Sequence, residues 1–74
     1  MNHYSMLIEW SDADQAYVVS FPEWEAAGDL AHTHGDTYIE AVTAGEEMLV
    51  FLIDARQADG KPLPVPRMFA AAQP

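Results

Sequence analysis

One helix dominates what this 74-residue chain can fold into. Residues 38–57 carry apolar side chains at helical spacing, and the segment has a clear start and a clear end. Thr37 and Glu40 fit a capping box, and Gly60 is a candidate C-cap. Because the other segments are short, they must pack against this helix. Its apolar stripe comprises Tyr38, Ala41, Val42, Gly45, Met48, Leu49, Leu52 and Ile53. The glycine in this stripe is either simply tolerated or marks a close approach of another segment.

Three segments before the helix are expected to form strands. Residues 3–10 and 16–21 alternate apolar and polar side chains, and the short polar loop between them indicates an antiparallel hairpin. Trp10 falls on the apolar face of the first strand, where we expect it to be buried. Residues 30–34 could add a short third strand, and residues 23–29 are expected to be irregular.

This order of elements predicts an α+β fold: a small antiparallel sheet (β-β-β) packed on one α-helix. Residues 62–66 carry proline at every second position, which favours an extended C-terminal arm and not a central strand. We assign residues 1–66 to a single domain and residues 67–74 to a flexible tail.

The middle of the helix predicts self-association. Residues 48–53 are apolar all round the helix, so they need a second covering surface. Another copy of the chain is favoured over the arm folding back, since a small domain without cysteine is often helped by oligomerisation. A homodimer or higher homo-oligomer is therefore expected, and its candidate contacts are Val50, Phe51, Ile53, Leu63 and Val65.

The charge distribution excludes a phosphate-binding surface over most of the chain. The formal net charge is −9 at pH 7, and no Lys or Arg precedes Arg56. Since affinity for nucleic acid comes mainly from Lys and Arg, we expect no direct nucleic-acid partner. The acidity suits a cationic partner, a metal or simple solubility.

Candidate chemical sites are weak. His32 and His34 share a strand face, but a zinc site would need a further ligand such as His3, so two exposed histidines are the favoured interpretation. Asp12 and Asp14 could join a Mg²⁺ cluster, but aspartate is also common in turns. We expect no catalytic residue, no metal and no cofactor.

Targeting signals are also absent from the pattern. No basic segment precedes an apolar run, and residues 48–53 form an apolar run far too short for a bilayer. We therefore expect a cytoplasmic protein with no membrane partner.

With these elements placed, the sequence resembles the HicB-like antitoxins of type II toxin–antitoxin systems. The first strand, the second strand with its Ser-Phe-Pro end, the Thr-His-Gly-Asp-Thr helix start and the Asp-Gly-Lys-Pro helix stop follow in family order. The matching segments are residues 8–10, 17–23, 33–38, 40–41 and 59–64. Many members also carry a C-terminal DNA-binding domain, which we do not expect in a sequence that stops at Pro74.

The resemblance implies a partial ribonuclease-H-like fold without ribonuclease activity. It also implies a partner: a small basic toxin (HicA-like) that cleaves mRNA, whose active site or RNA surface the antitoxin blocks. We therefore predict a non-enzymatic antitoxin that neutralises such a toxin through an acidic surface. The alternative is a solitary oligomeric module that binds a protein or a ligand without any toxin.

Charge and expected exposure select the candidate partner contacts. For Trp24, burial as a lid on the sheet is an open alternative to a role as an exposed anchor for the partner. The candidates are Asp12, Asp14, Glu23, Trp24, Glu25 and Asp29.

Overall fold

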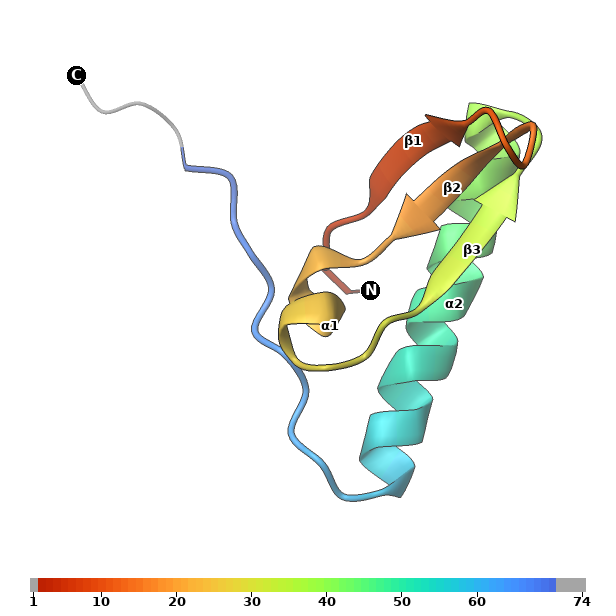
Figure 1. Ribbon diagram of the computed structural model, residues 1–74. Helices are drawn as coiled ribbons and strands as arrows, with labels where there is room; N and C mark the ends of the chain where they lie inside the picture. The colour runs from red at the N-terminus through yellow and green to blue at the C-terminus, as the bar shows by residue number, and fades with distance from the viewer. Residues whose placement is uncertain (1, 71–74) are drawn as a thin grey trace.

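A computed structural model describes residues 2–70 of the chain. The elements are β1 (Leu7–Ser11), β2 (Ala16–Ser20), α1 (Pro22–Ala26), β3 (His32–Gly35) and α2 (Tyr38–Ala58), as Figure 1 shows. The α+β class, with a three-stranded antiparallel sheet and one long helix, is confirmed. No helix in the described part combines the length and apolarity needed to cross a membrane.

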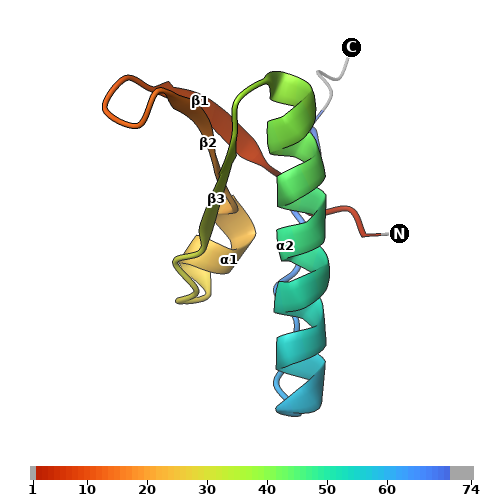
Figure 2. The same ribbon diagram turned by 90° about the vertical axis from the view of Figure 1, so that its right-hand side faces the viewer.

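The sheet and α2 form two layers, seen edge-on in Figure 2. The strand order is β1-β2-β3, and both pairings are antiparallel. Ile8, Val19 and Thr33 lie side by side in one cross-strand row, and alternation along the strands turns this row toward α2. The helix packs mainly on β3 and β2, so it leaves part of β1 uncovered.

The core lies where α2 and α1 meet β2. Its buried side chains are one valine, one phenylalanine and one tryptophan from the first half of the chain, with small and aliphatic residues from α2. These residues are Val19, Phe21, Trp24, Ala41, Leu49 and Leu52. The predicted apolar stripe of the helix is confirmed apart from Tyr38, which is 62% exposed.

Both ends of α2 follow the sequence prediction. At the start, Thr37 Oγ1 accepts the Glu40 N–H at 3.1 Å, and Glu40 Oε2 accepts the Asp36 N–H at 3.1 Å. At the end, Gly60 has a φ of 67° and the Lys61 N–H donates to the Arg56 carbonyl at 2.9 Å. This left-handed cap closes the helix with the bonds of a Schellman motif.

Two glycines let α2 approach the sheet closely. A Cβ on Gly45 would collide with the Met6 sulfur and lie 3.2 Å from Val19 Cγ1. The glycine therefore marks a close approach of another segment and is not simply tolerated. A Cβ on Gly35 would collide with the backbone of Glu40 and Ala41. The first collision involves a flexible side chain, whereas the second involves backbone that cannot move independently.

Two sequence predictions in the first half of the chain are wrong. Residues 22–26 are helical and not irregular, because Pro22 suits the first turn and Trp24 anchors the turn in the core with 0% exposure. Trp10 is 49% exposed and not buried, because α2 does not extend over the end of β1 where it lies.

A buried carboxylate joins three separate segments. Glu23, only 5% exposed, accepts the Ser5 N–H at 3.0 Å, the Ser5 hydroxyl at 3.1 Å and the Arg67 N–H at 2.9 Å. Burial by itself would raise the pKa of Glu23, but hydrogen bonds from Arg67, its own backbone and Ser5 hold that pKa below the ordinary value. Tyr4 adds a second tie, since its hydroxyl donates to the Pro64 carbonyl.

The predicted arm is extended, and these ties hold it against α1 and the N-terminal segment. The anchored Arg67 lies one residue beyond the expected domain end at 66. Of the expected flexible tail, residues 71–74 lie outside the described residues.

We expect the two close-approach glycines to respond differently to alanine. Gly35→Ala should lower the free energy of unfolding by about 3 kcal/mol, because the new methyl group meets backbone. Gly45→Ala should change it by less than about 1 kcal/mol, because Met6 can move and alanine favours the helix. Urea unfolding followed by circular dichroism measures both; equal losses would contradict the assigned contacts.

Glu23 should make the stability depend on acidity. Because its pKa is lower in the folded chain than in the unfolded chain, its contribution is present above the ordinary value of 4.5. That contribution is lost as the pH falls through the lowered pKa. Glu23→Gln should cost about 2 kcal/mol at neutral pH and flatten the loss of stability below pH 4.5. The exposed neighbour Glu25 supplies the control, and Glu25→Gln should leave the pH profile unchanged.

Candidate functional site

The structure divides the predicted partner contacts between two ends of the sheet. Asp12 and Asp14 lie in the loop between β1 and β2, whereas Glu25 lies on α1 at the other end of β2, as Figure 1 shows. All three residues are exposed. The six predicted contacts therefore do not form one surface.

Three of the predicted contacts are occupied within the chain. Trp24 and Glu23 are buried, at 0% and 5% exposure. The prediction that Glu23 is exposed to a partner is therefore wrong, and of the two interpretations of Trp24 the structure supports burial and not a partner anchor. The tryptophan packs at 5.2 Å from the Tyr4 ring and lies under the Arg56 guanidinium. Asp29 forms an ion pair with Arg56 at 2.9 Å. Glu23 and Trp24 have structural roles because α1 turns these two side chains inward, and Asp29 is paired with a cation of its own chain.

The hairpin loop holds its two carboxylates in fixed positions. The Ser11 hydroxyl donates to Asp14 Oδ2 at 2.9 Å, and the Gln15 side-chain amide donates to the Asp12 carbonyl at 2.7 Å. The same amide reaches Asp12 Oδ1 at 3.2 Å. Gln15 has a φ of 50°, a left-handed conformation that these bonds help to maintain. The loop thus presents two ordered negative charges to solvent.

Three aromatic rings lie in sequence beside this loop. Trp10 packs edge-on against Tyr17 at 5.2 Å, and Tyr17 stacks on Tyr38 at 4.3 Å. Trp10 is 49% exposed and Tyr38 is 62% exposed. We call these three residues the aromatic row. Sequence reasoning missed it, because the apolar periodicity of strand and helix predicted that the row would face the core.

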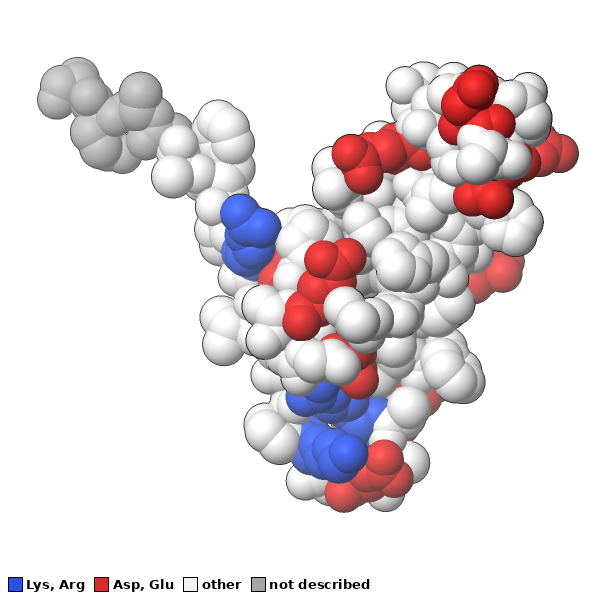
Figure 3. Space-filling model, in the orientation of Figure 1, with Lys and Arg blue, Asp and Glu red and all other residues white. Residues whose placement is uncertain are grey.

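The antiparallel topology brings further carboxylates to the same end of the molecule. Gly35, at the end of β3, pairs with Tyr17 near the start of β2, so Asp36 and Glu40 follow close to the hairpin loop. We call Asp12, Asp14, Asp36 and Glu40 the acidic end. Figure 3 shows acidic side chains over the upper part of the molecule, where Figure 1 places the hairpin loop. The chain's three cationic residues lie away from this end. They are Arg56, Lys61 and Arg67.

The acidic end and the aromatic row together suit a cationic group. Carboxylates accept charge-assisted hydrogen bonds from guanidinium and ammonium groups. Exposed indole and phenol faces attract the same groups through the negative face of the ring. This combination favours binding of a basic protein surface.

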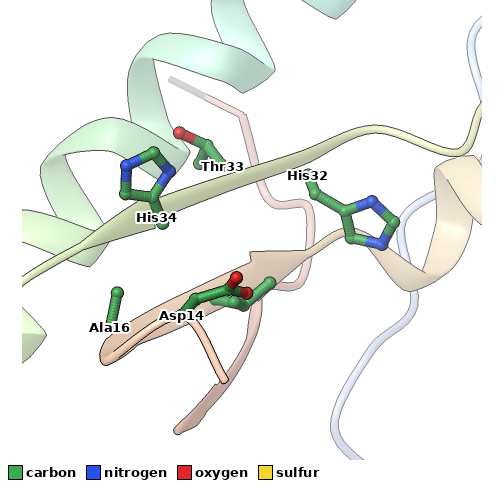
Figure 4. A pocket seen from close by; sticks show the side chains of 6 residues that line it. Asp14, Ala16, His32, Thr33 and His34 are labelled. Atoms are coloured by element: carbon green, nitrogen blue, oxygen red, sulfur yellow. The ribbon is translucent and has the colours of Figure 1, made fainter. Parts of the chain in front are cut away.

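The sheet face opposite α2 carries a shallow pocket, shown in Figure 4. His32 and His34 project from β3 there, and Asp14 lies below them in the view. Both histidines are exposed. Residues 2–70 contain no group of three or more His, Asp or Glu side chains arranged to hold a metal ion. The pocket therefore gives no support to a metal site.

The predicted oligomer contacts also fall on separate surfaces. Val50 and Phe51 on α2 are 55% and 65% exposed, so the arm does not cover them. Val65 is exposed on the arm beside α1, and Leu63 on the same arm is 37% exposed. Ile53 is partly buried and packs against the core of its own chain. The prediction that it contacts another copy is therefore wrong.

Comparison with known proteins identifies no relative of this chain. No family model matches the chain, and neither a curated protein nor a solved structure matches it.

Proposed function

We propose that this protein is an antitoxin that binds and neutralises a small basic toxin. The acidic end carries the proposal, since it presents four carboxylates and none of the chain's Lys or Arg residues. A basic partner gains long-range attraction toward such a surface and a faster rate of association. A nucleic acid, in contrast, would be repelled from it.

Neutralisation follows from competition for the same groups. A toxin that cleaves mRNA must hold phosphates with Lys and Arg side chains. Asp12 and Asp14 would occupy those cations and so exclude the RNA. Exposed ion pairs each contribute little, about 0–1 kcal/mol, so the affinity needs a second source.

The aromatic row supplies that second source. Trp10 and Tyr38 offer ring faces next to the carboxylates, and a guanidinium packed on such a face gains about 0.5–2 kcal/mol. Aromatic residues are also frequent hot spots of protein interfaces. The resemblance to HicB-like antitoxins names the same class of partner independently of this geometry.

The test starts from the reading frame adjacent to this gene. Co-expression of both chains should yield a copurified complex, and this chain should rescue growth when the neighbouring product is toxic. If no short basic product is encoded nearby, or if it neither binds nor harms growth, the solitary module becomes the better proposal.

Neutralising the hairpin charges should weaken the complex. Asp12→Asn with Asp14→Asn keeps the hydrogen bonds of the loop but removes two charges. We expect the Kd for the basic partner to rise about tenfold at low salt and less at high salt. The matched control is Glu46→Gln with Asp54→Asn, two exposed carboxylates on α2 whose loss should change the Kd less than twofold. Equal effects would show attraction by net charge alone.

Trp10 should report binding directly. Of the two tryptophans, Trp24 is fully buried and Trp10 is half exposed, so a partner at the acidic end changes the emission of Trp10 alone. Titration with the basic partner should shift the emission to shorter wavelength as water leaves the ring. The shift should disappear in Trp10→Phe. A shift that persists in this variant would place the partner elsewhere.

A further inference from the structure

A free strand edge lies on the side of the sheet away from β1. β3 is the last strand in the order β1-β2-β3, and within residues 2–70 no strand pairs with its outer edge. Natural edge strands are commonly protected by lysine, proline or a bulge. The sequence His32-Thr33-His34-Gly35 carries neither of those residues, so its outer backbone groups are open to pairing.

An apolar flank of α2 runs beside this edge. Thr33, Ala44, Met48 and Phe51 line a shallow groove between β3 and the helix, with Glu47 as its acidic residue. Phe51 is 65% exposed, although an aromatic ring of this size normally gains by burial.

A second hollow continues from Phe51 toward the end of the helix. Leu52 and Ala55 line it together with the charged residues Asp29, Arg56, Asp59 and Lys61. Leu30, just before β3, is 76% exposed. A strand edge and an apolar flank therefore form one continuous, uncovered surface.

We infer that this surface binds a second copy of the chain, with β3 pairing antiparallel to β3 across a two-fold axis. The two three-stranded sheets then become one six-stranded sheet. Each copy brings the same edge and the same flank, so the contact is self-complementary, as a two-fold dimer requires. The two α2 helices lie side by side on one face, and each Phe51 packs toward the flank of the other copy.

The net charge of the chain favours this antiparallel orientation of the two copies. Two chains of net charge −9 repel each other, so a stable contact must keep their acidic ends apart. Antiparallel pairing of β3 does this, because the acidic end follows Gly35 and the other copy has its His32 end there. β3 itself carries no carboxylate.

This surface replaces the predicted set of oligomer contacts. It keeps Phe51 but not Val65, which lies on the arm beside α1. Val50 lines neither of the two hollows that contain Phe51. The inference is independent of the proposed function, since the aromatic row and the hairpin loop stay free in the dimer.

The mass in solution tests the dimer. Sedimentation velocity from about 1 µM to about 1 mM should show a species of twice the 8.2 kDa chain mass. Phe51→Glu should move the dimerisation midpoint at least tenfold to higher concentration, with an unchanged circular dichroism spectrum.

Two matched controls separate the possible surfaces. Val50→Glu places the same charge on the next residue of the same helix, and Val65→Glu places it on the arm. Both should leave the midpoint within about twofold of the wild-type value. A monomeric wild-type chain, or a midpoint that moves with Val50→Glu or Val65→Glu but not with Phe51→Glu, overturns the proposal.

Cross-linking tests the pairing of the strands themselves. The chain has no cysteine, so a single introduced cysteine can form a disulfide only between copies. Antiparallel pairing across a two-fold axis at the middle of β3 places one residue opposite its own counterpart, so Thr33→Cys or His34→Cys comes within disulfide distance of the same cysteine in the other copy. At least one of them should oxidise to a dimer much faster than Asp14→Cys in the hairpin loop. Equal rates at all three positions would overturn the β3 pairing.

Discussion

The close approach of α2 to the sheet is the contact on which the rest of the structure depends. Gly35 and Gly45 have no side chain where the helix comes nearest, and a methyl group at Gly35 would meet backbone. This approach buries Val19 and Leu49 in one core. It also sets the start of α2 beside β2, so that Tyr38 stacks on Tyr17 and the aromatic row forms.

The opposite end of the molecule is held by polar groups. Arg56 bonds to Asp29 and to the Pro62 carbonyl, while Glu23 bonds to the N-terminal segment and the arm. These bonds occupy carboxylates that a count of charges would assign to a binding surface. Four of the remaining carboxylates lie together at the hairpin end, whereas the cations lie at the end where the chain is tied together.

The two proposed contacts use different parts of the molecule. The basic partner would meet the acidic end and the aromatic row, whereas the second copy would meet the outer edge of β3. A dimer built in this way presents two acidic ends that face apart, so each copy can bind a partner without a clash. Because the same chain carries both surfaces, loss of either contact alone should leave the other measurable.

The sequence by itself determined the three strands, the long helix and their order, although it missed the short helix α1. Local signals were sufficient there: alternation for the hairpin, Thr37 and Glu40 for the helix start, and Gly60 for its end. The tertiary structure decided which side chains are free. Trp10 is exposed against expectation and Trp24 takes the buried one of its two expected positions, because burial depends on how far α2 extends over the sheet and on α1 turning inward. Periodicity shows which face of a segment is apolar, but only packing shows whether another segment covers that face.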